Sequence, residues 1–167
     1  MVYSQVCRVP SFAVLSGNQV RRALHGRERR VLEIVEAAYR AHGAGAGGGV
    51  HVDGLRWAGS AGDAPAMLVL NDRETGYPFA CMEGSIISAV RTAALAVLAA
   101  GRLSRGRGRL RRLGFAGLGS VAQYVYSYLI ATGWRFDEIR GFDRADRAAG
   151  AFRSYVERRG GRVRSGS

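Results

Sequence analysis

Apolar residues recur with helical spacing between positions 19 and 42 of the 167-residue chain, and charged residues separate them. Such spacing places the apolar side chains on one face of a helix. Gly43 follows this segment, and glycine is favoured just after a helix. The pattern therefore predicts a single amphipathic helix, whose apolar face carries Val31, Ile34, Val35 and Ala38.

Shorter apolar runs in the first half of the chain predict β-strands. Residues 51–60 are typical of a strand and its exit, and the runs 66–70 and 77–82 flank a segment, 71–76, that is rich in turn-forming residues. Two apolar runs around such a turn predict a hairpin. Residues 43–49 are glycine and alanine alone, so they predict a flexible connection without packed side chains.

An alanine-rich segment, 86–100, predicts a long helix with Ser85 as its N-cap. Glu83 precedes this helix and has two interpretations: a charge that stabilises the helix N-terminus, or a group of a binding site. Further upstream, the short apolar stretch 10–16 ends in a turn-forming Ser-Gly-Asn sequence.

The second half of the chain alternates between strand and helix patterns. Residues 110–116 suit a buried strand, 120–132 a helix, 137–142 a strand and 144–159 a helix, and a third strand is expected to begin near Arg162. A βαβα succession is the signature of a parallel sheet. We therefore predict an α/β protein, with an α+β lobe over residues 1–104 followed by an incomplete Rossmann domain over residues 105–167.

A glycine-rich turn, Gly117–Ala122, lies between the first strand and the helix of this succession, and it matches G-x-G-x-x-A. In this pattern Gly117 makes the tight turn, Gly119 lets the backbone approach a pyrophosphate, and Ala122 keeps the helix close to the sheet. The following helix offers free N–H groups and a positive dipole end to phosphates. A glycine turn of some other α/β protein is the alternative interpretation.

Asp143 follows the second strand, 21 residues beyond Ala122. A carboxylate at this place binds the adenosine ribose of a dinucleotide and disfavours a 2′-phosphate, so it favours NAD over NADP. Arg144 and Arg147 lie nearby and weaken that preference.

Two arginines have open interpretations. Arg91, beside Thr92 within the alanine-rich helix, suits either a solvated surface position or a fixed cation for a carboxylate or phosphate. Arg56, on the strand near Trp57, raises the same question.

The formal net charge of +12 comes from 25 basic residues, all of them arginine, against 13 acidic ones. Such a charge raises the possibility of nucleic-acid binding. However, the densest cluster, Arg102–Arg112, contains no aromatic residues for base stacking, and a complete absence of lysine is typical of codon bias. We expect a solvated basic linker there and no nucleic-acid partner.

The remaining composition bounds the compartment and the chemistry. The chain has no run of eighteen apolar residues, so no membrane span is predicted. The N-terminus lacks the pattern of a signal peptide. Cys7 and Cys81 are expected to be reduced thiols, and the three histidines, His25, His42 and His51, have no ligand spacing. We expect a cytoplasmic protein without a metal site and without a membrane partner.

The segment Leu70–Ala94, with its Arg-Thr-Ala-Ala run, resembles the central segment of the ornithine cyclodeaminase/mu-crystallin family. Two further segments, Met82–Ser88 (MEGSIIS) and Gly54–Ser60 (GLRWAGS), are similar to its 2,3-diaminopropionate branch, the N-(2-amino-2-carboxyethyl)-L-glutamate dehydrogenases. Residues 12–17 and 37–43 agree with that branch, so the resemblance covers nearly the whole chain.

The resemblance implies an NAD-dependent amino-acid dehydrogenase that assembles as a homodimer, with the N-terminal lobe binding substrate and forming the dimer. NAD would take a hydride from the carbon that joins the substrate's secondary amine to its glutamate-derived part. Hydrolysis of the imine then gives 2,3-diaminopropionate, a siderophore and antibiotic precursor, and 2-oxoglutarate. By the same resemblance the substrate would contact Arg56 and Arg91, and NAD would contact Arg91, Thr92, Gly117, Gly119, Ser120, Val121 and Asp143.

The sequence also departs from the family pattern. Arg56 stands where the family usually has lysine, which preserves the charge but not the ability to lose a proton. Only glycine and alanine lie between Gly43 and Val50, where the family has a longer stretch with a substrate-binding arginine. A second family segment is missing between Asp63 and Ala66. The family chain is about twice as long, and its catalytic carboxylate lies in the later half, so no catalytic residue is assigned here.

Two alternatives follow from these departures. The first is a non-catalytic remnant that binds nucleotide or a partner at most. The second is ornithine cyclodeaminase activity, or another amino-acid or imine dehydrogenase activity of the same family.

Overall fold

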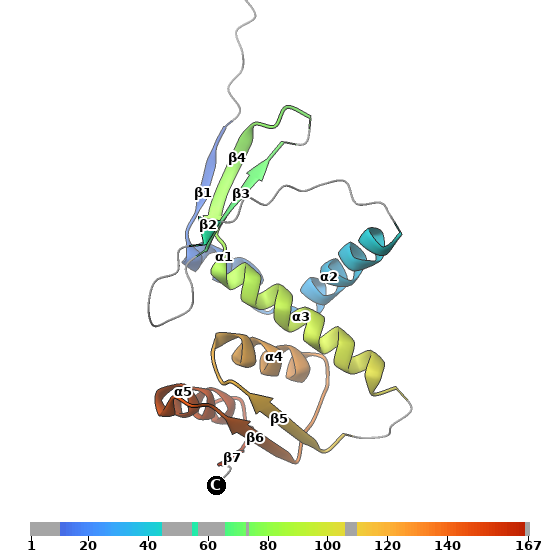
Figure 1. Cartoon of the computed structure of the whole chain (residues 1–167), viewed down its shortest axis with the longest axis vertical. Helices are drawn as coiled ribbons and strands as arrows, with labels where there is room; N and C mark the ends of the chain where they lie inside the picture. Colours follow the sequence, from blue (N-terminus) through green and yellow to red (C-terminus); the bar gives the residue numbers. More distant parts are fainter. Residues whose placement is uncertain (1–10, 45–54, 57–65, 73, 106–109, 166–167) are drawn as a thin grey trace, which may run out of the picture.

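A computed structural model of the chain describes residues 11–44, 55–56, 66–72, 74–105 and 110–165. Two separate β-sheets lie at opposite ends of the molecule, and one long helix, α3 (Ser85–Leu103), crosses between them (Figure 1). This arrangement is the predicted α/β fold, with an α+β part followed by a parallel-sheet part.

The first sheet has four strands in the order β1-β4-β3-β2. The predicted hairpin is confirmed, because β3 and β4 pair antiparallel and Asp72 accepts hydrogen bonds from Glu74 N–H (3.1 Å) and Thr75 N–H (2.8 Å) in the turn. The apolar stretch near the N-terminus adds a strand that the sequence did not predict, which pairs parallel with β4. The strands are β1 (Ala13–Leu15), β2 (Leu55–Arg56), β3 (Ala66–Asn71) and β4 (Pro78–Glu83).

The single helix predicted for residues 19–42 is wrong, because two helices form there: α1 (Gly17–Leu24) and α2 (Glu28–Gly43). Gly26 lies between them with φ of +72°, a left-handed conformation that ends α1 and that L side chains rarely adopt. Ser16 is the N-cap of α1 and forms a capping box with Gln19, so the predicted turn is a helix start. Gly43 is the last residue of α2 rather than the residue after it.

Helix α3 begins differently from the prediction as well. Gly84 is its N-cap, and Ser85 is its first residue. The Glu83 carboxylate accepts hydrogen bonds from Ser85 N–H (2.8 Å) and Ile86 N–H (3.0 Å), and the Ser85 hydroxyl contacts it too. Of the two interpretations of Glu83, the structure therefore supports stabilisation of the helix N-terminus.

The second sheet has three parallel strands in the order β5-β6-β7, as the βαβα pattern predicts. Helices α4 and α5 cover one face, where Phe152 is fully buried and meets the ring of Phe115 edge-on at 5.0 Å between centroids. The elements are β5 (Arg112–Ala116), α4 (Ser120–Ala131), β6 (Glu138–Phe142), α5 (Asp146–Glu157) and β7 (Val163–Ser165).

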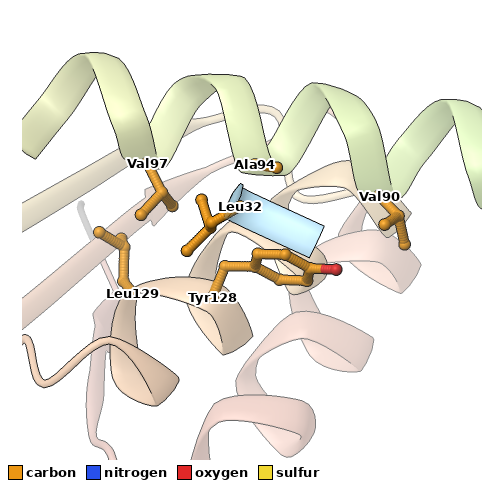
Figure 2. Packing of buried hydrophobic residues seen from close by; sticks show 6 residues of the cluster. All are labelled: Leu32, Val90, Ala94, Val97, Tyr128 and Leu129. Atoms are coloured by element: carbon orange, nitrogen blue, oxygen red, sulfur yellow. The ribbon is translucent and has the colours of Figure 1, made fainter. Parts of the chain in front are cut away.

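The main core lies where α2, α3 and α4 meet (Figure 2). Leu32 of α2 projects between Val97 and Ala94 of α3 on one side and Tyr128 and Leu129 of α4 on the other. Burial of Tyr128 in this cluster raises the pKa of its phenol. The core therefore joins the part that precedes residue 104 to the parallel-sheet part that follows it, and the division after residue 104 stays a prediction.

By length and composition alone, α3 is apolar enough to cross a membrane, with 19 residues and a mean hydropathy of 1.6. Core helices of globular proteins satisfy the same two criteria. In this fold one side of α3 packs against α2 and α4 through Val90, Ala94 and Val97.

Candidate dinucleotide site

The glycine-rich loop leaves β5 and enters α4 at the carboxyl end of the parallel strands. Gly117 has φ of +86° and donates its N–H to the Phe142 carbonyl at 2.8 Å, which joins the turn to the end of β6. Glycine is required there because other residues rarely adopt that φ.

Gly119 is different. Its φ is −70°, which any residue adopts, and no heavy atom lies within 4 Å of the place that a Cβ would take. Neither the backbone nor the packing of the described residues requires glycine at this position. A group outside the protein that approaches this backbone closely would require it.

The N-terminus of α4 points its positive end at the same place. Gly119 is its N-cap, no side chain caps the helix, and its first turn contains no acidic residue. Ser120 is half-buried and Val121 is exposed. An uncompensated helix N-terminus of this kind binds phosphate groups.

Asp143 lies directly after β6 and contacts the loop. One carboxylate oxygen accepts a hydrogen bond from Leu118 N–H at 2.7 Å, and the other accepts one from Ala145 N–H at 2.9 Å. These backbone bonds, that of Ala145 first, lower the pKa of the Asp143 carboxyl. The group is therefore a fixed anion at neutral pH, in reach of the loop.

Leu118 is a residue of this site that the sequence reasoning missed. Its side chain is 2% exposed and packs over β6, where a Cβ on Gly141 would lie only 2.8 Å from a Leu118 methyl group. The small residue on β6 therefore makes room for the leucine that anchors the loop. An apolar residue between the two glycines was the signal that could have indicated it.

A groove of about 630 Å³ opens beside the loop, between α3, β5 and α4. Its lining includes Gly117, Gly119, Ser120 and Val121, so the structure brings these predicted residues together. Ala96 is the first residue of α3 that lines the groove.

Arg91 and Thr92 precede Ala96 on α3 and do not line this groove. Arg91 is exposed and forms no hydrogen bond or ion pair with the described residues, and the Thr92 hydroxyl donates to the Ser88 carbonyl at 2.7 Å. Arg56 lies on β2, opposite Ala66 of β3. Its side chain is outside the described part of the structure, so the structure does not unite Arg56, Arg91 and Thr92 with the loop.

Within the described ranges no group of three His, Cys, Asp or Glu side chains is arranged to hold a metal ion. Cys81 is a free, half-buried thiol, and Cys7 lies outside the described residues. His25 and His42 are exposed, whereas His51 is not described.

The chain is similar to a known protein family over most of its length. A model of the ornithine cyclodeaminase/mu-crystallin family matches residues 18–167. The chain belongs to this family. Membership confirms the resemblance that the Arg-Thr-Ala-Ala run and the glycine-rich loop indicate.

Individual family members are similar over parts of their length. The N-((2S)-2-amino-2-carboxyethyl)-L-glutamate dehydrogenase of Staphylococcus aureus is 44% identical over an alignment of 68 residues, and the match covers 35% of this chain and 20% of that protein. The alanine dehydrogenase of Archaeoglobus fulgidus is 35% identical over 117 residues, 64% of this chain and 35% of that protein.

An archaeal alanine dehydrogenase dimer with bound NAD has a similar structure, with a TM-score of 0.70 and 24% sequence identity. The match covers 93% of this chain and 56% of that one. The chain thus has the fold of this family's dehydrogenases, and it spans little more than half the length of the archaeal structure.

Proposed function

We propose that this chain is the dinucleotide-binding part of an NAD-dependent amino-acid dehydrogenase. The observation that carries the proposal is the presence of glycine at position 119. Neither the backbone conformation there nor the neighbouring atoms require a glycine. A pyrophosphate lying against the loop accounts for it, since only glycine lets the backbone and the phosphate oxygens come so close. The uncapped α4 N-terminus beside it has the matching charge.

Each candidate residue has a role in this proposal. The backbone N–H groups of the loop, with Ser120 and Val121, hold the pyrophosphate, and the Asp143 carboxylate accepts hydrogen bonds from the adenosine ribose. Arg91 pairs with a substrate carboxylate or with the cofactor phosphates, Thr92 lies beside it, and Arg56 binds the substrate. When bound, NAD accepts a hydride from the carbon that carries the substrate amine.

For the substrate we propose N-(2-amino-2-carboxyethyl)-L-glutamate, which would give 2,3-diaminopropionate and 2-oxoglutarate for siderophore or antibiotic synthesis. Support comes from the 44% identity to the Staphylococcus aureus dehydrogenase over 68 residues. The 35% identity to an alanine dehydrogenase favours a second candidate, oxidation of a simple amino acid such as alanine.

The four-stranded sheet supports a homodimer. One of its faces carries Phe12, Val14, Met67 and Phe79, which are 40–71% exposed. By register Val14, Cys81 and Val69 lie side by side between them. We propose that a second copy covers this apolar face. The archaeal alanine dehydrogenase of similar structure is a dimer. A cytoplasmic location belongs to the same proposal.

The cofactor proposal is tested by NAD binding to two matched glycine variants. Gly119 and Gly150 are both exposed, and no heavy atom lies within 4 Å of a Cβ at either. We expect calorimetric titration to detect NAD binding to the natural chain and to Gly150→Ala. Gly119→Ala should keep its melting temperature and lose affinity at least tenfold. Equal affinity of all three proteins, or no binding by any, would overturn the proposal.

Turnover is tested separately. NADH absorbance is followed with N-(2-amino-2-carboxyethyl)-L-glutamate, alanine or ornithine as substrate. Formation of NADH with N-(2-amino-2-carboxyethyl)-L-glutamate supports the diaminopropionate assignment. Formation with alanine or ornithine instead would assign that amino acid as the substrate. NAD binding without any turnover would assign the chain to the non-catalytic alternative.

A further inference from the structure

A second cavity, of about 1090 Å³, lies between the two parts of the molecule. Its walls are α1, the first turn of α2, the start of α3, one side of α4 and the end of α5. Ser120 lines both this cavity and the groove beside the glycine-rich loop, whereas Arg91 lines neither. The cavity is large enough for a small organic ligand, and it is separate from the place proposed for the substrate carboxylate.

Tyr128 is a buried tyrosine of this cavity whose hydroxyl has no partner. The residue is 2% exposed, and its hydroxyl forms no hydrogen bond with the described residues. Among those residues no fully enclosed side-chain oxygen lacks a partner, so this hydroxyl opens into the cavity. Figure 2 shows it pointing toward Val90, which lines the same cavity. A ligand that bonds to this hydroxyl restores an interaction that burial removed.

Glu28, in the first turn of α2, is a half-buried carboxylate of the same lining. It forms no hydrogen bond or ion pair with the described residues. Burial first, and the charge of Glu28 second, raise the pKa of the Tyr128 phenol, so the two groups lie near each other. A carboxylate in a first helical turn also stabilises the helix, but this leaves its oxygens free to accept hydrogen bonds. An anion without a partner, beside a hydroxyl without one, suits a ligand ammonium group.

The opposite charge comes from Arg159, just after α5. Its guanidinium lies over the Tyr155 ring, 3.8 Å from the centroid, and one N–H donates to the Tyr155 carbonyl at 3.5 Å. The Tyr155 hydroxyl bonds to Ser127 of α4, which fixes the ring that supports the arginine. A guanidinium has five N–H donors, so Arg159 keeps donors for a ligand carboxylate.

The two charges lie on either side of α4, because Tyr128 leads to Glu28 and Ser127 leads to Arg159. A helix with its side chains is about 10–12 Å across, so the charged ends of a ligand that spans it are roughly 10 Å apart. An extended peptide advances about 3.3–3.6 Å per residue, so three residues match that span and a single amino acid does not.

We propose that this cavity binds an elongated zwitterion of tripeptide length, with its ammonium group at Glu28 and Tyr128 and its carboxylate at Arg159. Ala89 and Ala131, which are small, leave room for the body of the ligand. Such a ligand links α2 to α5, elements on opposite sides of the connection between the two parts, and stabilises both. Its binding needs neither NAD nor Arg91, so this proposal and the proposed function fail in different experiments.

The test is calorimetric titration of the full 167-residue chain with trialanine at millimolar concentration. Two related probes each lack one charged end: N-acetyltrialanine has no ammonium group, and trialanine amide has no carboxylate. The protein variants are Tyr128→Phe, Glu28→Gln and Arg159→Gln. Tyr126→Phe is the matched control, because Tyr126 is an equally buried tyrosine of α4 that packs in the other core cluster and does not line the cavity.

We expect trialanine to bind the natural chain and Tyr126→Phe equally and to raise their melting temperatures. Each of the other three variants should bind it about tenfold more weakly, as the natural chain should bind the two related probes. Glu28→Gln should bind N-acetyltrialanine as well as the natural chain does, since that probe has no ammonium group to lose.

Tyr128→Phe removes a hydroxyl without a partner, so it should keep its melting temperature. Glu28 and Arg159 are not buried, and their variants test the site even if Tyr128→Phe does not fold. Failure of trialanine to bind the natural chain would overturn the proposal. Equal affinity of the Glu28 and Arg159 variants for trialanine would do so as well, as would equal affinity of the natural chain for all three probes.

Discussion

Asp143 and Leu118 are joined by a hydrogen bond of 2.7 Å, which Leu118 N–H donates to a carboxylate oxygen at the end of β6. The bond fixes the turn of the glycine-rich loop to the neighbouring strand. A carboxylate offers about four acceptor sites, and Ala145 N–H uses one more of them. Asp143 therefore has sites left for ribose hydroxyls while it holds the loop.

Replacing this carboxylate separates its two roles. In Asp143→Asn only one side-chain oxygen accepts and the charge is gone, so either the loop or the ribose loses its partner. We expect NAD affinity to fall about tenfold, because a charge-assisted hydrogen bond to the ribose or to the loop is lost. The preference for NAD over NADP should fall too. Calorimetric titrations with NAD and with NADP measure the affinity for NAD and this preference. Asp146→Asn, on the exposed first turn of α5, is the control and should change neither.

The same carboxylate predicts a pH dependence of folding stability. Backbone N–H groups of Ala145 and Leu118 hold the pKa of Asp143 below its ordinary value. A lowered pKa stabilises the fold above the unfolded value, about 3.9, and this contribution is lost as the pH falls through the folded pKa. The melting-temperature difference between the natural chain and Asp143→Asn should therefore be constant from neutral pH to about pH 5 and shrink below about pH 4. A difference that grows on acidification would contradict the assigned hydrogen bonds.

Gly161 limits the packing behind the sheet. A Cβ there would lie 2.6 Å from a methyl group of Val156, which is fully buried beside Tyr126. We expect Gly161→Ala to lower the free energy of unfolding by about 1–3 kcal/mol in urea titrations. Gly101→Ala, within α3 and without a neighbour inside 4 Å, should raise it by roughly 0.5–1 kcal/mol. Equal effects of the two substitutions would show that the packing at Gly161 relaxes.

The proposed dimer face is tested by sedimentation velocity. Val14 is 71% exposed, so Val14→Lys should leave the fold of one copy intact and convert the dimer to monomer. Ile34→Lys changes another exposed aliphatic residue, on α2 and away from the sheet, and should sediment like the natural chain. If Ile34→Lys dissociated the dimer and Val14→Lys did not, the dimer interface would be assigned to α2 instead of the sheet.

The elements that sequence predicted well are those whose determinants are local. The βαβα succession and the hairpin predicted from the runs 66–70 and 77–82 follow from apolar periodicity and turn residues, and both are present. The helix predicted for residues 19–42 breaks because one glycine, Gly26, has a left-handed φ that periodicity does not indicate. The cap of α3 comes from the Glu83 side chain rather than from Ser85, since its carboxylate reaches two N–H groups at once.

Contacts between residues far apart in the chain could not be predicted from the sequence. Parallel pairing of β1 with β4 joins residues more than sixty positions apart, and no local pattern indicates it. In the candidate site, the motif indicated Gly117, Gly119 and Asp143, which the structure places around one loop. The bond from Leu118 to Asp143 depends on how β6 ends beside that loop, so it required coordinates.

The shared core of α2, α3 and α4 has a consequence for how this molecule comes apart. Leu32, Ala94 and Tyr128 belong to three different helices on both sides of the connection between the lobes, yet they bury one another. Neither lobe can melt without exposing part of the other, so thermal unfolding should be a single cooperative transition. A polypeptide cut between Ser104 and Leu110 should accordingly elute from size-exclusion chromatography as one complex of its two fragments. The side chains of the shared core would hold these fragments together without the covalent link.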